Sequence, residues 1–164
     1  MCHLGLSSLP KVRGALNSSF DLYAQASEEA MAMASTAWHR ALDVSEAELS
    51  VSAAVAYLVL AQEDRRLAIE AEKHTVDQIA KVPEGQGRSK LFGHIRLVKI
   101  RFLAGEAEQA CDDGDQILGM AEHVTSTTIQ ARLRELLADS EPYAALPRVV
   151  EFRERLRTSI GRLN

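Results

Sequence analysis

Histidine, cysteine and carboxylate side chains are the groups in this sequence that could bind a metal or carry out acid–base chemistry. No two of the five histidines lie three or four residues apart, the spacing that would place two ligands on one face of a helix. The two cysteines, Cys2 and Cys111, form neither a CxxC pair nor a combined Cys/His ligand set. The sequence therefore predicts no metal site and no cofactor.

Two shorter patterns each have a chemical and a structural interpretation. Glu70 and His74 lie one turn apart on a predicted helix, where they could form an acid–base pair or an ordinary surface contact. No nucleophile or second base lies nearby in the sequence, which favours the surface contact. Asp112, Asp113 and Asp115 resemble a fragment of a calcium loop, but the alternating ligands and the closing glutamate are missing. Because this run falls inside a helical pattern, we expect it to be the solvated face of that helix.

Motifs of the common enzyme classes are absent from the sequence. There is no GxSxG, Walker or HExxH motif. Cys111 lies on an apolar stripe, so we interpret it as a small core residue and not as a nucleophile. We therefore expect that the protein is not an enzyme, with scattered catalytic residues on a helical bundle as the alternative.

The overall composition is that of a single globular domain. The chain has 164 residues, of which 46% are hydrophobic, enough to bury a core without disulfides. The formal net charge of −4 predicts no strong attraction to nucleic acid, so we expect no direct nucleic-acid contact. Met1–Pro10 does not resemble a signal peptide, and the longest apolar run, Ala53–Ala61, is too short to span a bilayer. These features predict a cytoplasmic location and no membrane contact.

Apolar residues recur at helical spacing along nearly the whole chain, and strand patterns are almost absent. The clearest stripe is Leu91, Ile95, Val98 and Phe102, in a helix predicted over 88–104. Gly105 offers the left-handed conformation that ends a helix, and the next helix begins at once. The other predicted helices lie near 12–24, 27–42, 46–61, 64–81, 127–139 and after Pro147. This pattern predicts an all-α fold built from antiparallel helical hairpins.

Two segments repeat the same order of features. Ala53–Ile79 and His94–Leu118 each contain an apolar helix, a polar turn and a second helix with the triplet Asp-Gln-Ile near its end. Their anchor alanines, Ala68 and Ala110, are 42 residues apart. One hairpin cannot bury its apolar face alone, whereas stacked hairpins share a continuous core. An ordinary helical bundle whose hairpins look alike by chance is the alternative.

The repeat predicts a single α-helical repeat domain over residues 1–164. Its expected parts are a degenerate first hairpin at about 12–42, a second at 46–81, a third at 88–123, and C-terminal capping helices at 127–160.

The order of these elements resembles a known family. Phe102–Ala110, FLAGEAEQA, resembles the turn of a tetratricopeptide unit. Thr127–Leu137 and Leu146–Leu156 are similar to the C-terminal end of the helical sensor region of actinobacterial helix-turn-helix transcriptional regulators. The resemblance implies a short right-handed tetratricopeptide-like array with a regulatory role linked to transcriptional control. In that family a DNA-binding domain precedes the hairpins.

The sequence departs from the family pattern in several ways. The repeat spacing of 42 exceeds the tetratricopeptide norm of about 34 residues. Val98 is bulky where a small residue is expected, and Gln62–Glu63 replaces the glycine turn in the second hairpin. No helix-turn-helix module is visible before residue 50. The protein is therefore either a stand-alone sensor or the relative of a longer regulator.

The resemblance also places a candidate binding surface. In such arrays the first helices of successive hairpins line a concave groove that binds peptides or helices. By analogy the exposed groove positions come from 46–61 and 88–104, and those we name are Tyr57, Arg96, Lys99 and Arg101. The cations could bind a peptide carboxylate or acidic side chains. We expect a protein or peptide partner, with homodimerisation through the exposed ends of the stack as a further possibility. Small-molecule sensing in an apolar pocket is the alternative function.

Overall fold

The computed structural model describes residues 46–121 and 126–162, together with isolated positions between Pro10 and Gln25. The first hairpin, expected at about 12–42, lies outside the described residues apart from those positions. Within the described ranges the chain forms α-helices and two short 3₁₀ helices, with no strand. The prediction of an all-α fold is confirmed.

The described helices follow one another with short connections. In chain order they are α3 (Glu46–Ala61), η2 (Arg65–Leu67), α4 (Ala68–Lys81), α5 (Gly87–Ala104), α6 (Ala107–Ala121), α7 (Thr127–Asp139), η3 (Glu141–Tyr143) and α8 (Pro147–Arg162). The helix predicted over 64–81 is divided, because Asp64 caps a 3₁₀ turn by accepting a hydrogen bond from the backbone N–H of Arg66 at 3.2 Å.

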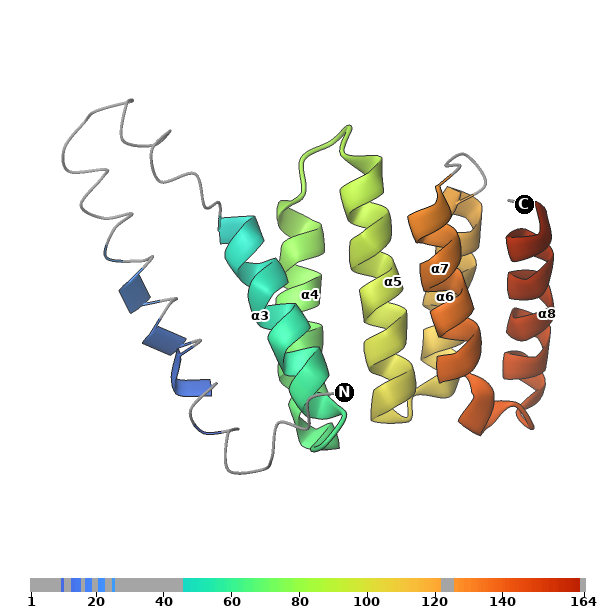
Figure 1. The fold of residues 1–164 in the computed structure, drawn as a ribbon, viewed down its shortest axis with the longest axis horizontal. Coiled ribbons are helices and arrows are strands. Elements are labelled where there is room, and N and C mark those ends of the chain that lie inside the picture. Colours follow the sequence, from blue (N-terminus) through green and yellow to red (C-terminus); the bar gives the residue numbers. More distant parts are fainter. Residues whose placement is uncertain are drawn as a thin grey trace.

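Consecutive α-helices run in opposite directions, and the helices follow one another across the molecule from α3 to α8, with α6 behind α7 in Figure 1. Helix α4 packs against both α3 and α5, whereas α6 packs against α5 and α8. Helix α7 contacts α5 and α8. Helix α5 therefore contacts α4, α6 and α7, and the 3₁₀ turn η2 that follows α3 also contacts α5.

Two core clusters meet at α5. The larger joins α5 through α8 and includes the whole predicted stripe of Leu91, Ile95, Val98 and Phe102. The smaller joins α3 and α4, and Ile100 of α5 completes it. Because α5 contributes to both clusters, apolar residues are buried on more than one of its sides.

Small residues allow the closest approaches between helices. The anchor alanines of the repeat, Ala68 and Ala110, are almost completely buried. A Cβ atom on Gly93 of α5 would lie only 2.6 Å from Cγ1 of Ile79 on α4. These contacts explain why an alanine or glycine occupies each crossing point.

The end of α5 has the predicted form. Gly105 has φ of 92°, and the N–H of Glu106 donates to the carbonyl oxygen of Arg101 at 2.9 Å. The hydroxyl of Tyr143 donates to the carbonyl oxygen of Phe102 at 2.9 Å, and the two rings stack. Residues 141–143 thus fasten the chain after α7 to the end of α5. Among the described helices, none is both long enough and apolar enough to cross a membrane.

Candidate functional site

Two adjoining hollows form a groove along one side of the helices. The first, of about 310 Å³, is bounded by α3, α5 and α7. The second, of about 320 Å³, shares Leu58, Gln62 and Lys99 with the first and extends it to η3. We call the two together the α3–α5–α7 groove. Its lining residues are Val55, Leu58, Val59, Gln62, Arg65, Phe92, Ile95, Arg96, Lys99, Phe102, Leu103, Arg132, Glu135, Leu136, Ala138, Asp139, Pro142 and Tyr143.

The first hollow has apolar walls that water can reach. Val55 and Val59 lie one turn apart on α3, and each is 44% exposed. Phe92 and Ile95 of α5 face the same hollow, with Leu136 of α7 beside them. The groove therefore combines exposed apolar area with side chains from three separate helices.

The structure brings together two of the four predicted binding residues. Arg96 and Lys99 both line the first hollow. Arg101 instead points toward α4 and α6, where its guanidinium pairs with Glu72 at 3.1 Å and with Asp113. The expectation that Arg101 lies exposed in the groove is wrong, because its side chain is only 11% exposed and two carboxylates neutralise it.

Tyr57 is also not an exposed groove residue. It is 3% exposed and belongs to the core between α3 and α4. Its ring stacks on His74 of α4 with the centroids 5.5 Å apart. Burial is the main reason that the pKa of His74 is lowered, and the neighbouring Lys73 lowers it further. His74 is thus a partly buried stacking partner of Tyr57.

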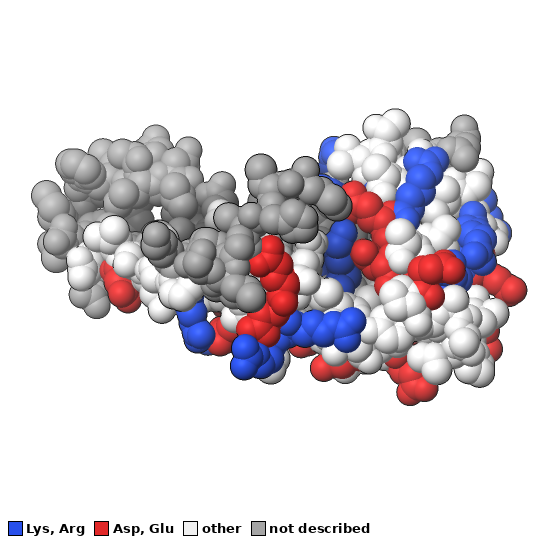
Figure 2. All heavy atoms as spheres, turned by 60° about the horizontal axis from the view of Figure 1, so that its bottom comes forward, with Lys and Arg blue, Asp and Glu red and all other residues white. Residues whose placement is uncertain are grey.

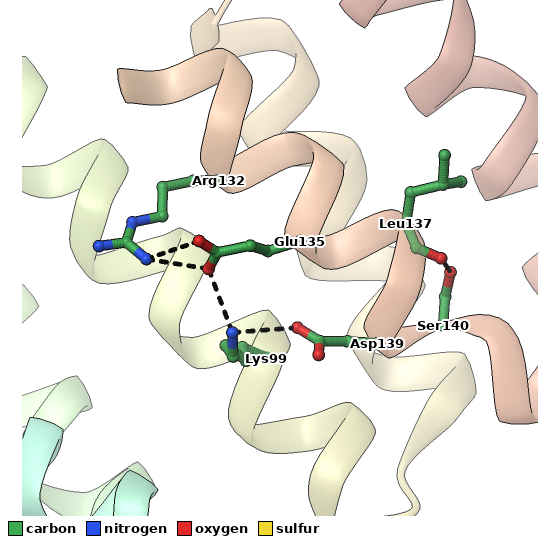
Figure 3. Close-up of polar contacts among 6 residues, drawn as sticks. All are labelled: Lys99, Arg132, Glu135, Leu137, Asp139 and Ser140. Carbon is green, nitrogen blue, oxygen red and sulfur yellow. Dashed lines mark hydrogen bonds and ion pairs between the residues drawn. The ribbon is translucent and has the colours of Figure 1, made fainter. Parts of the chain in front are cut away.

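Lys99 connects α5 to α7. Its ammonium group lies 3.2 Å from Oε2 of Glu135 and 3.4 Å from Oδ2 of Asp139, two carboxylates one turn apart on α7 (Figure 3). Arg132, also on α7, donates two hydrogen bonds to Glu135 at 2.8 and 2.9 Å. The positive charge of Lys99 is therefore balanced by the protein itself.

The two carboxylates that hold Lys99 have opposite pKa shifts. The pKa of Asp139 is raised, mainly by burial and further by the charge of Glu135, although Lys99 acts to lower it, and Oδ2 of Asp139 is buried without a well-aligned donor. Burial would also raise the pKa of Glu135, but hydrogen bonds from Arg132 and Lys99 together lower it. Glu135 is the better satisfied acceptor because it receives two cationic donors.

Arg96 has a different environment from Lys99. Its Nη1 donates to the amide oxygen of Gln78 on α4 at 3.2 Å, and Gln78 is buried. No carboxylate of the described residues lies within ion-pair distance of the Arg96 guanidinium. Burial lowers the pKa of Arg96, and the nearby charge of Arg132 lowers it further. Arg96 is therefore a half-buried cation with a neutral partner.

Sequence reasoning missed the third wall of the groove. Helix α7 was expected only as a capping element, yet Arg132, Glu135 and Asp139 all line the groove. The spacing of these residues at three and four places them on one helix face, which was a readable signal. Val55 and Val59 have the same spacing on α3 and were also missed.

The acidic run of α6 is only in part the solvated face that the sequence suggested: the Asp112 side chain is 71% exposed, whereas Asp113 and Asp115 are 18% and 25% exposed. Arg148 of α8 pairs with Asp112 at 2.8 Å and with Asp115 at 2.7 Å, and Arg155 also pairs with Asp115. Asp113 pairs with Arg101 of α5. Each carboxylate thus joins α6 to a neighbouring helix, because the run lies where three helices meet.

The described residues contain no metal-binding cluster, and Cys111 lies in the core. No group of three or more His, Cys, Asp or Glu residues among them is placed to hold a metal ion. Cys111 is completely buried, and burial raises the pKa of its thiol to about 11. The thiol therefore stays protonated at neutral pH, which matches a core residue.

Charges on the surface are interspersed. On the face shown in Figure 2, Lys and Arg side chains lie beside Asp and Glu side chains over the described helices, as the interhelical ion pairs require.

Comparison with known proteins adds no assignment. No family model, curated protein or solved structure matches the chain, so the groove is interpreted from its own geometry.

Proposed function

We propose that this chain is a non-catalytic module that binds a protein segment or peptide in the α3–α5–α7 groove, and that its helical pairs stack in the tetratricopeptide-like manner. One observation carries the proposal. The first helices of three successive pairs together line a groove made of two adjoining hollows, with exposed valines and a cation, Arg96, that has no carboxylate partner among the described residues.

The shape of the groove supports an elongated ligand. Hollows of 310 and 320 Å³ each lie at the lower end of the range of about 300–1,000 Å³ typical of ligand sites. They adjoin through shared lining residues, so together they offer space for a row of side chains. A peptide segment supplies such a row, whereas a compact molecule would fill one hollow only.

Small-molecule sensing is the second candidate, and the apolar walls of the first hollow favour it. Val55, Val59 and Gln62 are exposed at its rim, so it is an open groove and not an enclosed cavity. Small-molecule sites usually bury most of the ligand surface. The open rim is the reason that we prefer a peptide.

The regulatory role stays a prediction. The link to transcriptional control depends on the resemblance of residues 102–110, 127–137 and 146–156 to a family of regulators. The groove geometry is compatible with a regulator that is switched by a bound protein segment.

The proposal is tested by selecting peptides on the full chain. A displayed library of random 12-residue peptides is enriched on the wild-type protein, and the selected peptides are measured against Val59→Glu and Ile69→Glu. Val59 lies in the groove, whereas Ile69 is 73% exposed on α4 outside it. We expect Val59→Glu to weaken binding about 10-fold or more and Ile69→Glu to leave it unchanged. Peptides that bind both variants as tightly as the wild type would refute the groove.

A further inference from the structure

The groove has a positive bias in a chain of negative net charge. Its basic lining residues are Arg65, Arg96, Lys99 and Arg132, and its acidic ones are Glu135 and Asp139. The whole chain carries a formal charge of −4. The groove is therefore complementary to an acidic ligand although the protein as a whole is not.

The cations of the groove differ in whether a carboxylate of the protein balances their charge. Lys99 is held by Glu135 and Asp139, and Arg132 by Glu135, so those charges are already balanced. Arg96 alone among the cations of the first hollow has no carboxylate partner within the described ranges. Its recorded hydrogen bond goes to Gln78 from one terminal nitrogen. None of the other donors of its planar fork is paired with a described residue, so they can bind a ligand.

Gln78 orients the guanidinium without cancelling its charge. A neutral amide oxygen accepts one hydrogen bond and holds Nη1 at 3.2 Å, and Gln78 itself is only 4% exposed. A carboxylate in that place would neutralise the cation. The contact therefore fixes the position of Arg96 and keeps its charge for an incoming anion, as preorganised binding sites require.

The surroundings of Arg96 define what accompanies the anion. Phe92 and Ile95 of α5 lie beside it, and the exposed Val55 and Val59 face it across the hollow from α3. A free inorganic anion would gain nothing from these walls. A ligand with a carboxylate next to apolar side chains would cover them and reach the guanidinium at the same time.

We infer that Arg96 is the carboxylate anchor of the groove, and that the peptide partner is an acidic, apolar segment whose Asp or Glu side chain pairs with Arg96 while its neighbouring apolar side chains cover Val55, Val59 and Phe92. This inference rests on the proposed function and specifies the chemistry of its partner. Charge-assisted, forked contacts of this kind are the stronger class of hydrogen bond.

The test uses matched peptides and matched protein variants. The tightest acidic peptide from the selection and its Glu→Gln or Asp→Asn counterpart are synthesised, and their Kd values for the full chain are measured by fluorescence anisotropy. With the wild type we expect the amide peptide to bind about 10-fold more weakly or worse. With Arg96→Met the two peptides should bind within about twofold of each other, because the anchor that distinguishes them is gone.

Three further variants make the result specific. The quantity compared is the ratio of the Kd of the amide peptide to the Kd of the acidic peptide. Arg157→Met removes an exposed arginine on α8 outside the groove and should keep this ratio at about 10-fold. Arg132→Met removes a groove cation that Glu135 already balances, and it should also keep most of the ratio. Arg96→Lys retains charge but loses the fork, so it should reduce the ratio and serves as well if Arg96→Met does not fold.

The outcomes separate the inference from the proposed function. If the ratio persists in Arg96→Met, or disappears only in Arg132→Met, Arg96 is not the anchor while groove binding stands. Selected peptides without any acidic residue would overturn the anchor in the same way. If no selected peptide depends on Val59, the proposed function and the anchor fail together.

Discussion

Gly114 sets the distance between α6 and α8, and its replacement by alanine is a direct test of the packing. Gly114 is buried within α6. A Cβ atom added there would lie 2.7 Å from Cζ and 3.2 Å from Cδ2 of Phe152 on α8. Ordinary contacts between carbon atoms are about 3.5–4.0 Å, so the ring or the helix must move. Phe152 has no exposed surface and packs against Phe102, which leaves the ring little room.

The expected magnitude follows from two opposing terms. Overpacking a filled core costs about 1–3 kcal/mol. Replacing glycine by alanine inside a helix stabilises it by about 1 kcal/mol. Gly114→Ala should therefore lower the free energy of unfolding by roughly 0–2 kcal/mol in total, which alone is a weak test because the terms partly cancel.

Gly119 provides the control that separates the two terms. It lies on the same helix, is exposed, and a Cβ atom there would meet nothing within 4 Å. Gly119→Ala should raise the free energy of unfolding by about 0.5–1 kcal/mol. The difference between the two variants should then be about 1–3 kcal/mol, since the helix-propensity gain is common to both.

Urea denaturation of the full chain, followed by circular dichroism, measures both variants, and similar m-values would show that the same surface unfolds. Shortening Phe152 provides a further check. In a Phe152→Leu background, the destabilisation by Gly114→Ala should be smaller by at least about 1 kcal/mol, because the ring that meets the new Cβ atom is gone. The packing argument is refuted if Gly114→Ala stabilises the protein as much as Gly119→Ala, or if the Phe152→Leu background changes nothing.

Three other predictions concern single side chains. Arg153→Met should lower the free energy of unfolding by about 2 kcal/mol in urea denaturation, because the buried guanidinium donates to the carbonyl oxygen of Leu137 at 2.7 Å and to Oγ of Ser140 at 2.8 Å; an unchanged midpoint would contradict that role. Tyr143→Phe keeps the ring stack on Phe102 but loses the hydrogen bond to its carbonyl oxygen, so thermal denaturation should report a loss of about 1 kcal/mol. The pKa of His74 is lowered by burial, so the unfolded chain binds its proton more readily and stability should fall as pH decreases from about 7 through 6.5 and below. His74→Gln should flatten that part of the pH profile, and an equally steep profile in the variant would assign the effect to other groups.

The helices were predictable from the sequence because each buries apolar residues that recur at helical spacing. The predicted stripe of α5 is buried at all four positions, and the inner face that the spacing predicts for α6 is buried at Ala107, Ala110, Cys111, Ile117 and Ala121. For the helix over 64–81 the spacing predicts a buried stripe of Ala68, Ala71, Thr75 and Ile79, and the structure buries the first three but has Gln78 buried in place of Ile79. Helical spacing within α4 alone could not predict that Gln78 is buried instead of Ile79, because this depends on how closely α4 approaches Gly93 of α5.

Part of the candidate site was also predictable, and helical geometry shows which part. Successive residues of an α-helix turn by about 100°, so positions three apart share a side and positions five apart do not. Arg96 and Lys99 therefore belong on one side of α5, and Arg101 belongs on another, as the structure has it. Tyr57 lies four residues from both Ala53 and Ala61, which are completely buried, so its stripe already indicated the core.

Helical geometry could not predict that the charge of Lys99 is balanced by carboxylates whereas the charge of Arg96 is not. Both are cations on one side of the same helix, and nothing in the sequence of α5 separates them. Lys99 is neutralised by carboxylates of α7 that lie 36 or more residues along the chain, whereas Arg96 meets a neutral amide of α4. A cation becomes a candidate anchor only when the neighbouring helices leave its charge unbalanced. That condition belongs to the packing of three helices, so it can be read from the assembled groove and not from any one of its walls.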